Sequence, residues 1–169
     1  MTELSRPAAL SVVHRRIFEA TEVVIRLRDA EFVLRRGTPL PEEFRDLGIG
    51  YVLTAHDPHG VPSTAPENER RQQQLETALL QVPHSLLAPA VGRDPAPGPD
   101  RHEEASVAMW GVREFDVLRL ASEFGQLAVF VLDPSSEDGL RVLATSGDVP
   151  PPDTPGEPQH DVGQADGSP

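Results

Sequence analysis

The stretch LASEFGQLAVFVLD, residues 120–133, joins the end of an amphipathic segment to a short apolar run, and this junction constrains the fold most strongly. Within 113–124 the apolar residues recur with the period of an α-helix and share one face. Gly125 suits the left-handed position that ends a helix, and LAVFVLD then predicts a fully apolar, central strand. Gln126, an uncharged amide at the junction, could hold the start of that strand or form the wall of a site.

Hydrophobic periodicity and turn residues predict the other elements. The clearest helix follows Thr64, because Thr64 and Glu67 have the spacing of a capping box and Pro66 falls in the first turn. Asp138-Gly139 predicts the turn of a hairpin between LAVFVLD and LRVLAT. The remaining expected elements are a weak helix over 10–20, a hairpin around Arg28-Asp29-Ala30, a helical turn within 39–47, and strands over 48–55 and 105–111.

The order of these elements favours an α+β fold. We expect a two-layer sandwich, with one mixed, mostly antiparallel sheet of about five strands and helices on one face. The chain divides into an N-terminal helical segment over 1–20, a single α+β domain over 21–147 and an acidic, proline-rich tail over 148–169. The tail has too few large apolar residues to offset the entropy of ordering, so we predict that it is disordered. The proline-rich stretch 88–104 is expected to be a long loop.

Composition excludes several classes of function. The chain has no cysteine, which excludes disulfides, thiolate nucleophiles and cysteine–zinc sites. Its formal net charge of −12 opposes contact with a phosphate backbone, so general nucleic-acid binding is not expected. No signal-peptide pattern begins the chain, and no apolar stretch approaches the roughly 18 residues of a membrane helix. These features predict a cytoplasmic, soluble protein that does not associate with membranes.

Polar residues gather at the ends of the predicted strands, where binding sites are usually built. They follow the strand 48–55, occupy the first turns of the helix after Thr64, precede the strand 105–111 and begin the run LAVFVLD. Asn68 lies at the helix start, where free N–H groups and the helix dipole favour an anion, and Arg70 and Arg71 are nearby. The predicted ligand-binding residues are Thr54, His56, Asp57, Asn68, Arg71, Glu104 and Gln126.

Five short motifs follow one another through this part of the chain. They are Thr54-Ala55-His56-Asp57-Pro58, Ser63 with Asn68, Gly92-Arg93-Asp94, His102-Glu103-Glu104-Ala105-Ser106, and Phe124-Gly125-Gln126-Leu127-Ala128. Their order and spacing resemble a bacterial domain-of-unknown-function family, the one numbered 3293, over roughly residues 20 to 145. Where that family usually has an aromatic residue, Asn and Trp, this chain has His56, Asp57 and His102. The resemblance implies no activity, but it supports the domain limits and the interest of these polar positions.

Three classes of function are consistent with the sequence. The leading hypothesis is a polar pocket at the strand ends that binds a small polar or anionic ligand, or a peptide. The second is an enzyme that uses Glu104 or Asp57 as a general acid or base. The third is a protein–protein interaction module whose acidic half or tail docks on a basic partner. The first two require the predicted side chains to share a cleft, and Gln126 could reach Asn68 or Glu104 across it.

Metal and cofactor chemistry have weaker support in the sequence. Residue types that bind divalent metals occur here, but their spacing matches no established metal motif, so no metal site is predicted. The residues concerned are His56, Asp57, His59, His102 and Glu104. No serine lies in a nucleophile elbow, and no glycine-rich nucleotide loop is present. The cofactor, if the protein uses one, is unknown from the sequence.

Overall fold

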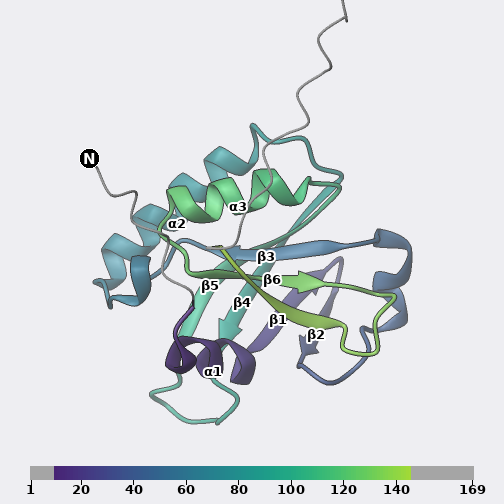
Figure 1. The fold of residues 1–169 in the computed structure, drawn as a ribbon, viewed down its shortest axis with the longest axis horizontal. Coiled ribbons are helices and arrows are strands. Elements are labelled where there is room, and N and C mark those ends of the chain that lie inside the picture. Colours follow the sequence, from purple (N-terminus) through teal and green to yellow (C-terminus); the bar gives the residue numbers. More distant parts are fainter. Residues whose placement is uncertain (1–9, 146–169) are drawn as a thin grey trace, which may run out of the picture.

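The computed structural model describes residues 10–145, which form three α-helices and seven strands (Figure 1). The helices are α1 (Val12–Ala20), α2 (Ala65–Leu79) and α3 (Glu114–Glu123), with single 3-10 segments η1 (Glu42–Leu47) and η2 (Pro58–Gly60). The strands are β1 (Glu22–Leu27), β2 (Ala30–Leu34), β3 (Gly50–Thr54), β4 (Leu86–Arg93), β5 (Glu103–Trp110), β6 (Ala128–Leu132) and β7 (Leu140–Ala144). The predicted tail 148–169 and the first part of the predicted N-terminal segment lie outside the described residues.

All seven strands belong to one sheet, in the order β2-β1-β4-β5-β3-β6-β7. Every neighbouring pair is antiparallel, and the hairpins β1–β2 and β6–β7 form the two edges. The predicted α+β class is confirmed, as are both hairpins and the helices over α2 and α3. The prediction of a mixed sheet of about five strands is wrong, because the sheet has seven strands and no parallel pair.

The strand that the sequence failed to indicate is β4, which occupies most of the stretch expected to be a loop. Pro89 lies within it, and proline usually argues against an internal strand because it has no N–H to donate. The pairing of β4 with β1 begins only at Ala90, so Pro89 lies outside the doubly paired part of the strand. The true loop is short and spans 94–102, between β4 and β5.

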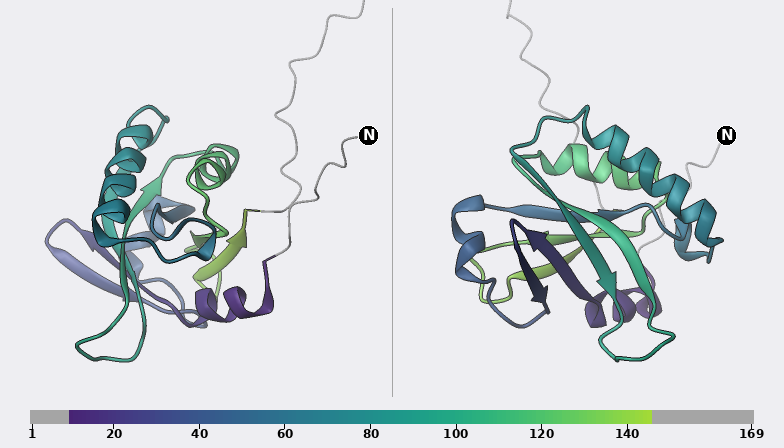
Figure 2. Two further views of the ribbon diagram at one scale, coloured as in Figure 1. Left: turned by 90° about the vertical axis from the view of Figure 1, so that its left-hand side faces the viewer. Right: turned by 180° about the vertical axis from the view of Figure 1, so that it is seen from behind.

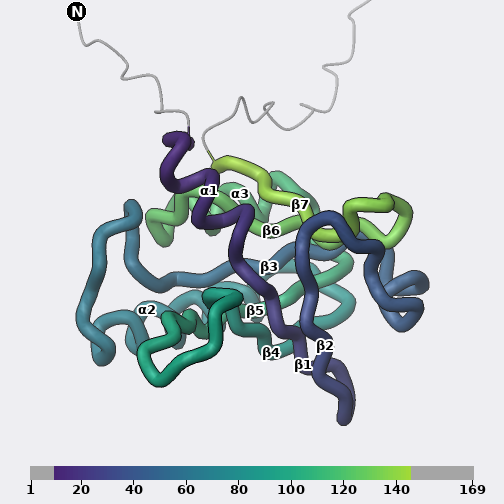
Figure 3. Tube along the Cα trace, turned by 90° about the horizontal axis from the view of Figure 1, so that it is seen from below, coloured from purple at the N-terminus to yellow at the C-terminus, as the bar shows by residue number. Residues whose placement is uncertain are grey.

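Each face of the sheet has its own hydrophobic core, because side chains alternate between the two faces along each strand. Figure 2 shows the helices and the sheet from two further sides. On one face α2 and α3 cover the central strands, and Leu75 and Leu53 are both almost fully buried there. On the other face the curl of the sheet encloses Val52 and Trp110, and Phe18 of α1 packs against this second core. The expected two-layer sandwich with helices on one face is therefore wrong; Figure 3 shows α1 in front of the sheet, on the side opposite α2 and α3, where it contacts β7.

The two ends of the curled sheet are held together by contacts between loops. The N–H of Gly139, just before β7, donates to the carbonyl of Thr38, after β2, at 3.2 Å. The N–H of Gly37 donates to the Asp138 carboxylate at 2.7 Å. These bonds join segments from the two edge hairpins, so the second core is enclosed by the chain itself.

The helix start at Thr64 is confirmed, but its capping box does not form. The Thr64 side chain makes no capping hydrogen bond, and its carbonyl oxygen accepts the first N–H groups instead. Both Thr64 and Glu67 are exposed, so water can satisfy their polar atoms. Glu67 lies 3.8 Å from the Arg70 guanidinium, which offers its carboxylate a charged partner within the helix. No helix among residues 10–145 is long and apolar enough to cross a membrane.

Gly125 ends α3 as predicted, with a φ of 70° that lies in the left-handed region. Its carbonyl oxygen accepts the N–H of His59, in η2, at 2.7 Å. A Cβ atom at this position would lie 2.9 Å from the Cβ of Pro58, so the close approach of η2 also requires glycine. The end of α3 and the turn after β3 are thereby packed against each other.

Candidate functional site

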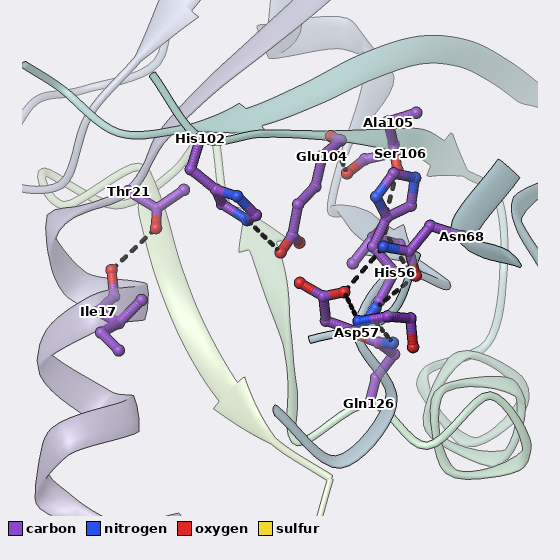
Figure 4. A network of polar contacts seen from close by, with 12 residues as sticks. Ile17, Thr21, His56, Asp57, Asn68, His102, Glu104, Ala105, Ser106 and Gln126 are labelled. Atoms are coloured by element: carbon purple, nitrogen blue, oxygen red, sulfur yellow. Dashed lines mark hydrogen bonds and ion pairs between the residues drawn. The ribbon is translucent and has the colours of Figure 1, made fainter. Parts of the chain in front are cut away.

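Five segments meet beside this contact and line one cleft of about 200 Å³. They are α1, the turn after β3, the end of β4, the start of β5 and the residues before β6, and Figure 4 shows labelled side chains from most of them. The polar lining of the cleft includes His56, Asp57, Asp94, His102, Glu104 and Gln126. Four of the seven residues predicted to bind a ligand therefore lie in a common cleft.

Asp57 is the most firmly held carboxylate of the cleft. Its backbone is left-handed, with φ 43° and ψ 61°, and its N–H donates to Asn68 Oδ1 at 2.9 Å. Asp57 Oδ1 accepts from Asn68 Nδ2 at 2.8 Å and from the Ser63 N–H at 2.9 Å. Burial alone raises the pKa of Asp57, but the bonds from Asn68 and Ser63 outweigh it and hold that pKa below its usual value. The carboxylate is thus charged and fixed, and its second oxygen makes no hydrogen bond to the described residues.

Thr54 supports the cleft without lining it. Its Oγ1 donates to the carbonyl of Ala105 at 2.8 Å and accepts the N–H of His56 at 3.1 Å. One hydroxyl therefore fixes the end of β3 against the start of β5. Gln72, which sequence reasoning missed, acts similarly: its Oε1 accepts the Ala55 N–H at 3.1 Å. Gln72 lies four residues after Asn68 on the buried stripe of α2, and this spacing was the signal that could have identified it.

Gln126 joins the start of β6 to the turn after β3. Its Nε2 donates to the carbonyl of His56 at 2.8 Å, and the amide is almost fully buried. The backbone carbonyl oxygen of Gln126 accepts a hydrogen bond from the Thr145 hydroxyl at 2.7 Å. The hydrogen bonds of Gln126 do not go to Asn68 or Glu104, which sequence reasoning had considered as its partners. Gln126 instead positions the backbone next to Asp57.

His102 and Glu104 form a hydrogen-bonded pair at the start of β5, with 2.8 Å between Nε2 and Oε1. The bond to Glu104 raises the pKa of His102 above its usual value, whereas burial lowers the pKa of His56. His102 therefore gains a proton more readily than His56 does. Residues two apart along an extended chain face the same side, which places His102 and Glu104 in the cleft and leaves Glu103 outside it.

Asp57 completes a compact group with this pair. One ligand atom from each of Asp57, His102 and Glu104 can be chosen so that all three lie within 4.8 Å of one another. Figure 4 shows the three side chains converging from the turn after β3 and from β5. Two carboxylates and one imidazole can bind a cation, accept hydrogen bonds from a ligand or exchange a proton. His102 was absent from the predicted ligand-binding residues.

Two arginines have different positions from those the sequence suggested. Arg71, predicted to bind a ligand, does not line the cleft, and its buried Nε has no hydrogen-bond partner within residues 10–145. Arg93 lines the cleft but lies 3.1 Å from a carboxylate oxygen of Glu22, whose other oxygen is 2.6 Å from Arg35. The buried Glu22 carboxylate forms an ion pair with Arg93, so the Arg93 guanidinium is largely unavailable to a ligand in the cleft.

A second, more open groove of about 630 Å³ runs along α2 on the other side of the Asp57 turn. It shares His56, Asp57 and His102 with the cleft, so these side chains separate the two hollows. Asn68 lines the groove rather than the cleft. Of the predicted residues, Thr54 and Asn68 support the cleft from beside it, and Arg71 lies outside it. The residues that line the cleft are His56, Asp57, Glu104 and Gln126.

Comparison with known proteins gives one match. No curated protein and no solved structure matches the chain. Residues 53–129 match the model of a family described as "Protein of unknown function (DUF3293)". This range begins at the end of β3 and ends in β6, so it contains the Asp57 turn, α2, the His102–Glu104 pair and Gln126. The resemblance expected from the motifs is therefore confirmed over residues 53–129, a shorter range than the expected 20–145, and there the chain is similar to the DUF3293 family.

Proposed function

We propose that the protein binds a small polar ligand in the cleft, through Asp57, His102 and Glu104. The observation that carries this proposal is the convergence of a fixed, charged carboxylate with a hydrogen-bonded His–Glu pair in one cleft. A volume of about 200 Å³ is below the range of about 300–1,000 Å³ of sites for drug-sized molecules, which favours a small ligand.

The charges of the cleft select the kind of ligand. Three carboxylates line it, from Asp57, Asp94 and Glu104, while the Arg93 guanidinium is engaged by Glu22. Acceptors therefore outnumber available cationic donors, so a ligand with hydroxyl or amino groups is favoured over a free anion. A small anion would need a cation beside it to neutralise these carboxylates.

The cleft is also arranged before any ligand binds. Asn68 and Ser63 fix Asp57, Gln126 fixes the His56 backbone, and the binding of a ligand would not have to order these groups. Preorganisation of this kind increases affinity because less conformational entropy is lost on binding. Buried amides that bond backbone groups around a charged carboxylate support a binding role for the turn.

A general-base enzyme is the second candidate, favoured by the orientation of His102. Its Nε2 is bonded to Glu104, an arrangement in which a carboxylate orients an imidazole for proton transfer. The bond to Glu104 raises the pKa of His102 above its usual value, whereas the lowered pKa of Asp57 makes that carboxylate a weak base. Among the described residues, His102 is therefore a better proton acceptor than Asp57, with Glu104 as the residue that positions it.

A thermal-shift screen of the full chain in the presence of EDTA tests the proposed binding. The compounds are polyols and sugars, amines and amino acids, and carboxylates and phosphates. A ligand at 100 times its dissociation constant stabilises the folded state by about 2.7 kcal/mol, which is several degrees for a chain of this size. We expect shifts from the first two classes.

Matched variants locate the binding. Glu104→Gln removes a carboxylate of the cleft, while Glu103→Gln removes the neighbouring carboxylate, which lines the second groove along α2 and not the cleft. We expect Glu104→Gln to abolish the shift and Glu103→Gln to retain it. The proposal is contradicted if no compound shifts the wild type, or if both variants respond as the wild type does.

A further inference from the structure

We propose that Asp57, His102 and Glu104 together bind one divalent transition-metal ion of the first row, such as Zn²⁺ or Mn²⁺. This inference rests on the proposed function of the same cleft and names the cofactor through which it would act. The sequence spacing did not indicate such a site because the three donors come from two separate segments, the turn after β3 and the start of β5.

The three donor atoms are already close to the arrangement that a metal needs. They lie within 4.8 Å of one another, whereas ligands bonded to one ion at about 2.0–2.2 Å lie roughly 3–3.5 Å apart. Closing the site therefore requires movements of about 1 Å, within the reach of side-chain rotation. The His102 side chain is 57% exposed and can make most of this movement, which exchanges its hydrogen bond to Glu104 for a bond to the ion, while Asp57 stays fixed.

The mixture of donors indicates the class of ion. Two carboxylates suit Mg²⁺, Ca²⁺ and Mn²⁺, but an imidazole nitrogen favours Zn²⁺, Fe²⁺ and other transition metals. A single nitrogen beside two oxygens therefore selects first-row transition metals over Ca²⁺ and Mg²⁺, which are bound by oxygen ligands. Cysteine is absent from the chain, so no thiolate competes for a soft ion.

Surrounding hydrogen bonds hold the donors in the way that outer-shell partners hold known metal ligands. Asp57 Oδ1 accepts two hydrogen bonds, from Asn68 and Ser63, which leaves the other oxygen available to an ion. The loop before β5 is held by the Asp94 N–H, which donates to the His102 carbonyl at 3.1 Å. Both segments that carry donors are thus fixed by bonds that an ion would not disturb.

Three protein donors leave coordination positions open toward the cleft. Catalytic and ligand-exchanging metal sites share this arrangement, whereas structural sites are closed by a fourth protein ligand. A divalent cation would also neutralise the two carboxylates that bind it. The cleft could then accept an oxygen-bearing ligand with negative charge, which its carboxylates alone disfavour. A neutral imidazole has only one nitrogen lone pair, and a His102 that binds an ion with it cannot also accept a proton. The metal site and the general-base mechanism are therefore mutually exclusive.

Isothermal titration of Zn²⁺ and Mn²⁺ into the full-length protein tests the inference. The protein carries no affinity tag and is first stripped with EDTA and dialysed, and Mg²⁺ and Ca²⁺ serve as comparison ions. We expect one Zn²⁺ or Mn²⁺ per chain and weaker binding of Mg²⁺ and Ca²⁺. Absorption of a Co²⁺-substituted sample should show the d–d bands of nitrogen and oxygen coordination.

Variants identify the donors. Asp57→Asn, His102→Gln and Glu104→Gln should each weaken the binding at least about tenfold, because each removes or weakens a donor. Glu103→Gln and His84→Gln are the matched controls, since neither residue lines the cleft, and they should leave affinity within about twofold. Circular dichroism and thermal unfolding show whether each variant is folded, and the Co²⁺ spectrum of the wild type does not depend on any variant.

Two results overturn the metal site: no saturable binding of any of these ions, or binding that all three donor variants retain. The ligand screen is performed in EDTA, so its outcome is independent of the ion. A compound that binds in EDTA when no ion binds the stripped protein would overturn the metal site and support the proposed function. Ion binding to the stripped protein, together with no response to any compound in EDTA, would support the metal site and overturn the proposed function.

Discussion

Gln126 and His56 are joined by a 2.8 Å hydrogen bond, from the Gln126 side-chain amide to the His56 carbonyl oxygen. The two residues are 70 positions apart and come from opposite ends of the segment that matches the family. The bond ties the start of β6 to the turn after β3. Asp57 follows His56 directly, so this buried amide determines where the fixed carboxylate of the cleft lies.

Replacing Gln126 with Ala should destabilise the protein. The substitution leaves the His56 carbonyl without its donor, and an unsatisfied buried group costs about 1–3 kcal/mol. Urea unfolding measures the change, with Gln74→Ala as the control because Gln74 is exposed on α2. Equal stability of the two variants would show that the amide does not hold the turn.

Gly125→Ala should cost at least about 1–2 kcal/mol, since an L-residue in the left-handed region carries that strain. The added methyl group also lies 2.9 Å from Pro58, so the turn that carries Asp57 must shift. Gly98→Ala is the control, because its φ is not positive and no atom lies within 4 Å of the added methyl. Thermal unfolding of both variants checks the difference, and a neutral Gly125→Ala would contradict the close packing of η2 on α3.

Glu22 should make stability depend on pH. Burial raises its pKa, but the hydrogen bonds and charges of Arg35 and Arg93 outweigh burial and lower that pKa below 4.5. A lowered folded-state pKa gives stability that is present above the unfolded value of 4.5 and lost as the pH falls through the folded value. Glu22→Gln should therefore cost about 1.5–3 kcal/mol at pH 7 and progressively less below pH 4.5.

Glu31→Gln is the matched control for Glu22→Gln. Glu31 pairs with Arg26 at 3.4 Å, but both side chains are more than half exposed, and such pairs contribute about 0–1 kcal/mol. Urea unfolding between pH 3 and pH 7 measures both variants. The account of Glu22 fails if its variant loses no more stability than the control, or if the loss does not diminish in acid.

Asn68→Ala should affect both stability and the cleft. Asn68 accepts the Asp57 N–H and donates to its carboxylate, so the variant leaves two groups of the turn without their partners. We expect a loss of about 1–3 kcal/mol in unfolding free energy and weaker Zn²⁺ binding by about 10–100-fold, as for other outer-shell partners of metal ligands. Gln73→Ala, at an exposed position of the same helix, should change neither quantity, and unaltered Zn²⁺ affinity in Asn68→Ala would contradict the positioning role.

The elements with strong local signals could be predicted from the sequence. The helical period before Gly125, the apolar run after it and the turn at Asp138-Gly139 each depend on nearby residues alone. The strand β4 could not be recognised, because Pro89 and the prolines after it indicate a loop, and the pairing that stabilises β4 comes from distant strands. The curl of the sheet depends likewise on long-range packing.

The sequence could predict which residues lie at the strand ends near the candidate site. It could not predict which side chains contact one another there. Asp57, Glu104 and Gln126 were identified because they end or begin strands, and the structure places them in one cleft. The partners of each side chain depend on the distances between strands that are not adjacent in sequence. The three departures from the family pattern, at His56, Asp57 and His102, all lie in this cleft, which no single motif revealed.

The central claim is that Asp57, His102 and Glu104 form one centre that binds a metal ion, and anomalous diffraction from a crystal soaked with Zn²⁺ or Mn²⁺ tests it most directly. We expect one strong anomalous peak in the cleft, about 2.0–2.2 Å from a donor atom of each of the three residues. An ion bound elsewhere, with none in the cleft, or a crystal structure in which the three side chains do not converge, would contradict the claim.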